Sequence, residues 1–181
     1  FSVNKFYNEL RSQGRTVSKD TLYAALSHLE DAYLIAVVGL DDRSEAKRAV
    51  NPRKIYPIDP GLAAAYSFSS ARNTGHLLET VIYLELRRRG FSCGYGKTSE
   101  GFEVDFIARR QGLGDEVLIQ VAVHLDEPTT RERELRALMA MMVERGKRCA
   151  VLVTLDSMET IETPAGVIRV VPAWQWLLEA D

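Results

Sequence analysis

The chain has 181 residues, of which 46% are apolar and 27% charged, and its net charge at pH 7 is −2. This composition excludes collagen, wholesale disorder and a disulfide-rich mini-protein. No apolar run approaches the roughly 20 residues that a membrane helix needs, so we expect no membrane association. Because the chain is not basic as a whole, any nucleic-acid site must be a local patch.

The chain has two cysteines, begins with Phe1 and shows no charged-then-apolar leader. We therefore expect reduced thiols at Cys93 and Cys149 and a cytoplasmic location. We also expect the sequence to be a piece cut from a longer protein.

The first 66 residues predict a small α+β unit. An apolar stripe between Val3 and Leu10 recurs at helical spacing, and Ser18 is a good N-cap for a second helix. Residues 34–38 and 54–58 are strand-like, and a charged stretch separates them. Helix, helix, strand, basic loop, strand is the order of a winged helix, so we assign residues 1–66 to a truncated winged-helix domain. Residues 67–73 are the expected linker.

Five of the residues between 43 and 54 are basic and only Glu45 opposes them. Such a patch suits phosphate contacts. The candidate nucleic-acid-binding residues are Lys19, Arg43, Lys47, Arg48 and Arg53. The alternative is a solvated hairpin or an interface to another domain.

Residues 74–181 alternate between helical and strand patterns, which predicts an α/β domain. A helix over 74–89 is followed by strands over 91–96, 103–109 and 116–123. Thr129 and Glu132 match a capping box for a second long helix, and strands over 149–154 and 167–171 precede a closing helix over 173–179. A meander followed by a crossover predicts a mixed sheet flanked by helices.

Acidic side chains gather on the predicted meander. Alternation places Glu103 and Asp105 on one face of their strand, with Phe102, Val104 and Phe106 on the other. Gln120, Ala122 and His124 share a face of the next strand. We expect these acids and Gln120 to meet beside Glu79 of the preceding helix. Such oxygen ligands suit Mg²⁺ or Mn²⁺, which could activate water for phosphodiester hydrolysis. The alternative is a solvated strand face.

These residues carry a resemblance to the PD-(D/E)XK restriction-endonuclease-like core, in Gly101-Phe102-Glu103-Val104-Asp105-Phe106 followed by Ile119-Gln120-Val121. The resemblance implies a restriction-endonuclease-like mixed sheet and a metal site at Glu79, Asp105 and Gln120. The lysine of that pattern corresponds to Ala122, and Lys97 is the first candidate for a relocated lysine.

A narrower resemblance, to the C-terminal region of a group of bacterial and archaeal AAA-type ATPases, covers nearly the whole chain. It rests on Lys54-Ile55-Tyr56-Pro57-Ile58-Asp59-Pro60-Gly61-Leu62, Gly75-His76-Leu77-Leu78-Glu79, Glu103-Val104-Asp105-Phe106, Ile119-Gln120-Val121-Ala122 and Thr130-Arg131-Glu132-Arg133-Glu134-Leu135. It implies that ATP binds an N-terminal domain absent from this chain. That domain would then be a partner, alongside DNA or a second copy.

Three hypotheses remain open from the sequence. The first, which we favour, is a nuclease-like module without catalytic activity that binds DNA or a partner, because Gln120 and Ala122 replace a charged ligand and the lysine. The second is a metal-dependent DNA nuclease with a relocated lysine. The third is a DNA-binding or regulatory winged-helix protein whose second domain dimerises.

Overall fold

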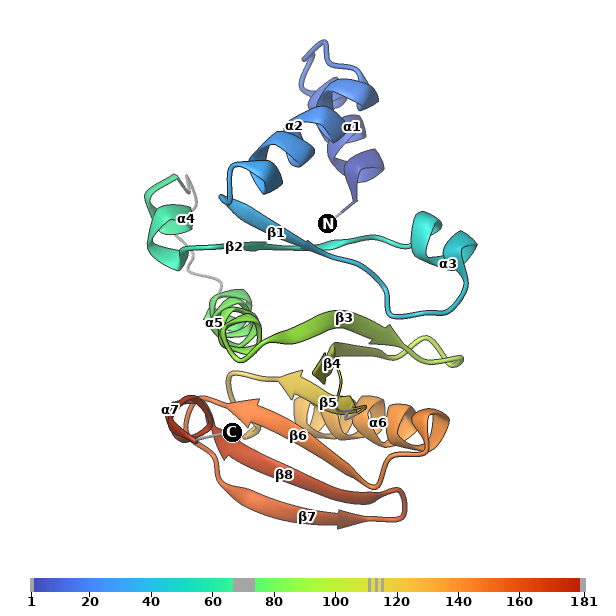
Figure 1. Cartoon of the computed structure of the whole chain (residues 1–181), viewed down its shortest axis with the longest axis vertical. Helices are drawn as coiled ribbons and strands as arrows, with labels where there is room; N and C mark the ends of the chain where they lie inside the picture. Colours follow the sequence, from blue (N-terminus) through green and yellow to red (C-terminus); the bar gives the residue numbers. More distant parts are fainter. Residues whose placement is uncertain (1, 67–73, 111, 113, 115, 180–181) are drawn as a thin grey trace.

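The computed structural model describes residues 2–66, 74–110, 112, 114 and 116–179 (Figure 1). Its N-terminal elements are α1 (Val3–Ser12), α2 (Lys19–Asp31), β1 (Ile35–Val38), α3 (Glu45–Val50), β2 (Lys54–Pro57) and α4 (Pro60–Tyr66). The two predicted helices and two predicted strands are present, and β1 and β2 pair antiparallel. The expected linker over 67–73 lies outside the described residues. The division into domains 1–66 and 74–181 stays a prediction.

The charged stretch between β1 and β2 differs from the loop that the sequence predicted. The Ser44 side chain accepts a hydrogen bond from the backbone N–H of Lys47 at 3.3 Å, and residues 45–50 form helix α3. A serine N-cap satisfies an orphan N–H of the first helical turn, which explains why so short a helix begins there. Lys47 and Arg48 therefore lie on a helix and not on a hairpin tip.

The remaining elements form a mixed α/β layer structure. They are α5 (Thr74–Arg88), β3 (Phe91–Lys97), β4 (Glu103–Arg110), β5 (Glu116–Val121), α6 (Pro128–Arg145), β6 (Cys149–Thr154), β7 (Glu159–Thr163), β8 (Gly166–Pro172) and α7 (Ala173–Leu178). The six strands follow the order β3-β4-β5-β6-β8-β7. Strands β3, β4 and β5 form an antiparallel meander, while β5–β6 and β6–β8 pair parallel. The predicted mixed sheet flanked by helices is confirmed.

Two local expectations in this part were wrong. Strand β7 was not predicted, and it pairs antiparallel with β8 at the edge of the sheet. The capping box at Thr129 and Glu132 does not form. Helix α6 already begins at Pro128, with Glu127 as the N-cap residue and no side-chain cap bond. Proline suits the first helical position because its missing N–H would have no helical partner there.

Helices α5 and α6 cover opposite faces of the sheet. Leu78, Ile82 and Leu86 of α5 pack in one apolar core with Phe106 and Ile119. A second core joins Leu138, Met141 and Met142 of α6 to Ile107, Leu118 and Leu152. Since neighbouring strand residues point to opposite faces, the two cores lie on the two sides of the sheet. None of the described helices combines the length and the apolarity needed to cross a membrane.

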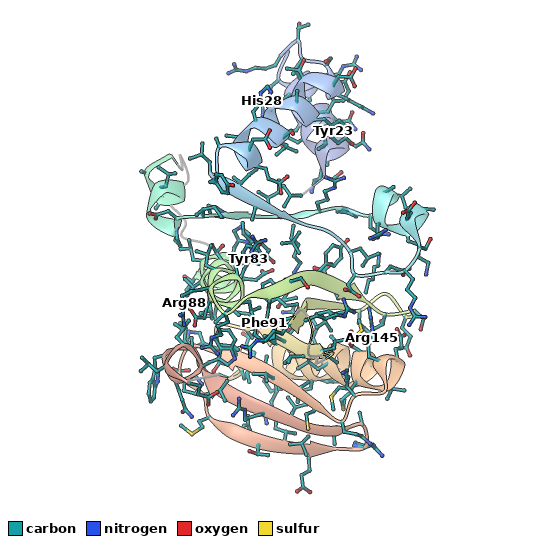
Figure 2. The ribbon with its side chains drawn as sticks, viewed as in Figure 1. Tyr23, His28, Tyr83, Arg88, Phe91 and Arg145 are labelled. Atoms are coloured by element: carbon teal, nitrogen blue, oxygen red, sulfur yellow. The ribbon has the colours of Figure 1, made fainter. Side chains whose placement is uncertain are left out.

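The N-terminal segment is attached to the sheet at the free edge of β3 (Figure 1). The backbone N–H of Asp41 donates to the Tyr95 carbonyl at 2.8 Å, and the N–H of Tyr95 donates to the Gly39 carbonyl at 3.1 Å. Aromatic packing adds a second attachment. The fully buried Tyr56 of β2 stacks on Tyr83, which lies on the side of α5 that faces β2, at 4.7 Å between ring centroids (Figure 2). Strand β2 is therefore fixed over α5 and β4.

Candidate functional site

The conformation of β4 around Asp105 differs from regular alternation. Val104 packs in the core beneath α6, whereas Phe106 packs in the core beneath α5. The register between β3 and β4 shifts between Gly94 and Gly96, which is a β-bulge. The expectation that Val104 and Phe106 share a face was therefore wrong. A bulge re-aims the side chains next to it, and here it turns Phe106 to the side of the sheet covered by α5. Glu103 and Asp105 share one face, as alternation predicted, and both contact one cation.

That cation is the ammonium group of Lys54. Its Nζ lies 2.7 Å from Oδ1 of Asp105, 2.8 Å from Oε1 of Glu79 and 3.0 Å from Oε1 of Glu103. The four residues come from three elements: β2, α5 and the start of β4. The side chains of Lys54, Glu79 and Asp105 are mostly buried, while that of Glu103 is half exposed. We call these four residues the Lys54 cluster.

A tyrosine hydroxyl completes the contacts of the Lys54 cluster. The O–H of Tyr56 donates to Oε1 of Glu79, the oxygen that also faces Lys54. Burial raises the pKa of Tyr56 well above its usual value, and the nearby Glu79 raises it further. The hydroxyl therefore stays protonated and donating. Lys54 and Tyr56 were not among the predicted site residues, although both lie in the Lys-x-Tyr run that carried the ATPase resemblance.

Burial and charge act against each other on the ionisable groups. Burial raises the pKa of Asp105 to about 6; Lys54 opposes this shift, and Glu79 adds to it. Burial alone would lower the pKa of Lys54, but the charges of Asp105 and Glu79 outweigh it, so the pKa lies above its usual value. At neutral pH the cluster thus contains the Lys54 ammonium held against the ionised carboxylate of Asp105.

Gln120 does not join Glu79 and Asp105 as the sequence led us to expect. Its Oε1 accepts a hydrogen bond from the backbone N–H of Asp105 at 3.0 Å, and its Nε2 donates to Oε2 of Glu134 at 2.6 Å. Glu134 lies on α6, which covers the opposite face of the sheet from α5. Gln120 therefore braces the bulge and connects it to α6. The buried Glu134, which sequence reasoning also missed, is its partner.

The other candidates lie around the cluster. Ala122 is buried in the core beneath α6, where a lysine side chain would meet apolar groups. Lys97 is exposed and lines the rim of a cleft of about 140 Å³ that also touches Lys54, Arg53 and Glu103. His124 is half exposed, and its Nδ1 lies 3.8 Å from Oδ1 of Asp156. The lysine that reaches the carboxylates is thus Lys54, and not Lys97.

The arrangement does not fit the divalent metal ion that the nuclease pattern implies. Across the part of the chain that the structure describes, no group of three His, Cys, Asp or Glu residues is placed to hold a metal ion. The carboxylate oxygens of Glu79, Glu103 and Asp105 face an ammonium, and the amide oxygen of Gln120 accepts from backbone. Mg²⁺ needs oxygen ligands at about 2.0–2.1 Å in near-octahedral geometry. The ammonium occupies the space between these oxygens.

A larger cleft, of about 880 Å³, lies between the end of β1, the β3–β5 meander and the C-terminal end of α6. We call it the basic groove. Its cationic lining residues are Arg43, Arg48, Arg109, Arg145 and Lys147. Arg145 lies on the last turn of α6 (Figure 2).

Two acids in the groove are already paired. Asp41 accepts hydrogen bonds from Arg109 and from Arg145, the latter at 2.8 Å. Glu116 accepts from Arg109 at 2.5 Å. Arg43, Arg48 and Lys147 add positive charge beyond these pairs. Two further acids, Asp42 and Glu144, also line the groove, and Arg48 lies 3.7 Å from Glu45.

The predicted nucleic-acid-binding residues do not form one surface. Arg43 and Arg48 line the basic groove, and Arg48 and Arg53 line a neighbouring cleft of about 340 Å³. Lys47 pairs with Asp42 at 3.3 Å. Lys19 lies over the ring of Tyr7 at 5.3 Å, within the α1–α2 helical pair. Sequence reasoning missed Arg145 and Lys147, which come from α6 and the residues that follow it.

Comparisons with known proteins agree with the fold. The restriction endonuclease family, Mrr_cat, matches residues 71–161, about half of the chain. The chain therefore belongs to this family. No solved structure matches it significantly.

Two curated relatives match over longer ranges. An uncharacterized protein of Methanocaldococcus jannaschii, MJ1544, is 31% identical over 98% of this chain. An uncharacterized protein of Haemophilus influenzae is 34% identical over 70% of it. The chain covers 40% and 31% of the lengths of these relatives, respectively.

Proposed function

We propose that this chain is a nucleic-acid-binding module built on a restriction-endonuclease-like domain, and that it does not hydrolyse phosphodiester bonds. One observation carries the proposal. Lys54 Nζ lies within 3.0 Å of three carboxylates in the region where a nuclease of this fold class needs a metal. Because Lys54 neutralises these oxygens, they do not hold a metal ion that would generate a hydroxide nucleophile from water.

The basic groove supports the binding part of the proposal. Five cationic side chains line this cleft of about 880 Å³. Asp41 holds two of them, Arg109 and Arg145, in place, and the other three can adjust to a ligand. Cations of this kind contact phosphate oxygens without reading sequence. We therefore expect binding that depends strongly on salt and weakly on base sequence.

The binding prediction is tested by fluorescence polarisation with labelled duplex and single-stranded DNA. If Arg43, Arg48 and Lys147 contact three phosphates, affinity falls roughly 40-fold for duplex DNA between 50 and 200 mM salt. Reversing all three charges with Arg43→Glu, Arg48→Glu and Lys147→Glu should remove most of this binding.

The matched control places the same three reversals on the α1–α2 pair, at Lys5, Arg11 and Arg15. It changes the net charge equally and leaves the groove intact. The proposal expects the control to retain most of the affinity of the parent. Equal losses in the two variants would show that only overall charge matters, and the groove assignment would be wrong.

A second candidate function, a metal-dependent nuclease with a relocated lysine, is favoured by the contact of Lys54 with Asp105. Incubation of supercoiled, linear and branched DNA with Mg²⁺ or Mn²⁺ separates the two. We expect the parent and Asp105→Ala to leave the DNA equally intact. Cleavage by the parent that both Asp105→Ala and Lys54→Met abolish would establish the nuclease and overturn our proposal.

We further propose that the module belongs to an AAA-type ATPase, with residues 1–66 acting as a winged helix and the ATPase domain as its partner. The motif resemblance supports this, and the curated relatives are more than twice as long as the stretch matched. The expected result is that deleting this module from such a parent alters DNA-stimulated ATP hydrolysis. An unchanged ATPase rate with and without DNA would contradict it.

A further inference from the structure

The contacts of the Lys54 cluster leave little freedom to its oxygens. Oδ1 of Asp105 faces Lys54 at 2.7 Å, and its Oδ2 accepts from the backbone N–H of Val121 at 2.9 Å. Oε1 of Glu79 accepts from both Lys54 and Tyr56. Three oxygens of the two buried carboxylates therefore accept hydrogen bonds from donors of this chain.

The strand that carries Lys54 is itself firmly placed. Tyr56, two residues further along β2, is fully buried, and its ring stacks with those of Tyr83 and His76. Its ring also contacts Phe106 at 5.7 Å between centroids, next to Asp105 in β4. Because residues two apart point to the same side of a strand, the packing that fixes Tyr56 also directs Lys54 towards the carboxylates. The ammonium is thus part of the packed structure.

A divalent ion would have to compete with this ammonium for the cluster. Both need the same oxygens of Glu79 and Asp105, and two cations so close together would repel each other in a largely buried site. Removing the ammonium would leave three carboxylates facing one space, and hard oxygen ligands of this kind are what Mg²⁺ and Mn²⁺ prefer.

We propose that Lys54 is the resident cation of this cluster and excludes divalent metal from it. This inference deepens the proposed function, because it gives the reason why the module does not cleave. It predicts that a metal-binding site is latent in the fold and is revealed by one substitution.

The test is isothermal titration of Mn²⁺ into purified parent, Lys54→Met and Lys97→Met at pH 7.5. Lys97→Met removes an exposed lysine at the rim of the same small cleft and is the matched control. We expect Lys54→Met to bind one Mn²⁺ at least about tenfold more tightly than the parent, a difference of 1.4 kcal/mol. We expect Lys97→Met to behave as the parent, and adding Asp105→Asn to Lys54→Met to abolish the gain.

Two results would overturn the inference. One is tight Mn²⁺ binding by the parent that Asp105→Asn removes, since Lys54 would then not exclude metal. The other is a folded Lys54→Met, judged by circular dichroism, that binds Mn²⁺ no better than the parent. If Lys54→Met folds only with Mn²⁺ present, the inference is supported; if it does not fold at all, Lys54→Gln is judged by the same criterion. No nucleic acid is involved, so this experiment can fail while groove binding holds.

Discussion

Replacing Lys54 by methionine will lower the free energy of unfolding by about 3–5 kcal/mol at neutral pH, the usual cost of removing one partner from a buried ion pair. Methionine keeps most of the apolar length of the side chain, so the loss reports the charge. Glu79 and Asp105 would be left mostly buried and facing each other without a cation. Urea unfolding of the parent, Lys54→Met and the exposed control Lys97→Met measures the difference.

The pH dependence of that loss follows from Asp105. Its pKa is raised to about 6 in the folded chain from an ordinary value of 3.8. A raised carboxyl pKa contributes stability below 3.8 that is lost as the pH rises through 6. Without Lys54 the pKa of Asp105 rises further. The loss of unfolding free energy in Lys54→Met should therefore be smaller at pH 5 than at pH 8. A deficit that is the same at both values would mean that lost packing, and not unpaired charge, causes it.

Replacing Asp41 by alanine will lower the free energy of unfolding by about 2–3 kcal/mol, because its carboxylate accepts charged hydrogen bonds from two arginines. Asp41 is mostly buried and joins Arg109 of β4 to Arg145 of α6. Its backbone also pairs with Tyr95, so the side chain fixes the N-terminal segment where that segment meets the sheet. Thermal or urea unfolding tests this, with the exposed Asp31→Ala as control.

Lowering the pH should reduce the loss of unfolding free energy that Asp41→Ala causes. Burial acts to raise the pKa of Asp41, but hydrogen bonds from Arg109 and Arg145 outweigh it, and the pKa lies below 3.8. A depressed carboxyl pKa contributes stability that is present above 3.8 and is lost as the pH falls through the folded value. The parent and Asp41→Ala should therefore converge in strongly acidic solution. An undiminished difference there would show that the ion pairs do not carry the stability.

Much of the fold was predictable because hydrophobic periodicity is local. The stripes of α5 and α6 and the apolar runs of β4, β5 and β6 placed those elements to within a few residues. Strand β7 was missed because Glu159–Thr163 contains two acids and alternates weakly, as an edge strand can when its partner β8 supplies most of the burial. Helix α3 was missed because a six-residue helix depends on the Ser44 cap more than on any apolar pattern.

The candidate site was only partly predictable for a different reason. Glu79, Glu103 and Asp105 were identified from their spacing on a helix and a strand, and the structure brings all three together. Lys54 is separated from Asp105 by 51 positions and belongs to an element that the sequence assigned to another domain. The β-bulge that separates Gln120 from the cluster is a tertiary feature without a local signal. The available clue was the Lys-x-Tyr run of β2, to which the sequence analysis assigned no function.

The most direct test of the account is to observe the Lys54 ammonium itself by ¹⁵N-detected NMR, with Lys54→Met to assign its signal. If Lys54 is the resident cation, its Nζ protons will be protected from exchange with water at neutral pH. The signal will also stay unchanged when Mg²⁺ is added to millimolar concentration. A Lys54 ammonium that exchanges freely, or that Mg²⁺ displaces from the cluster, would contradict the account and point to a metal-dependent nuclease.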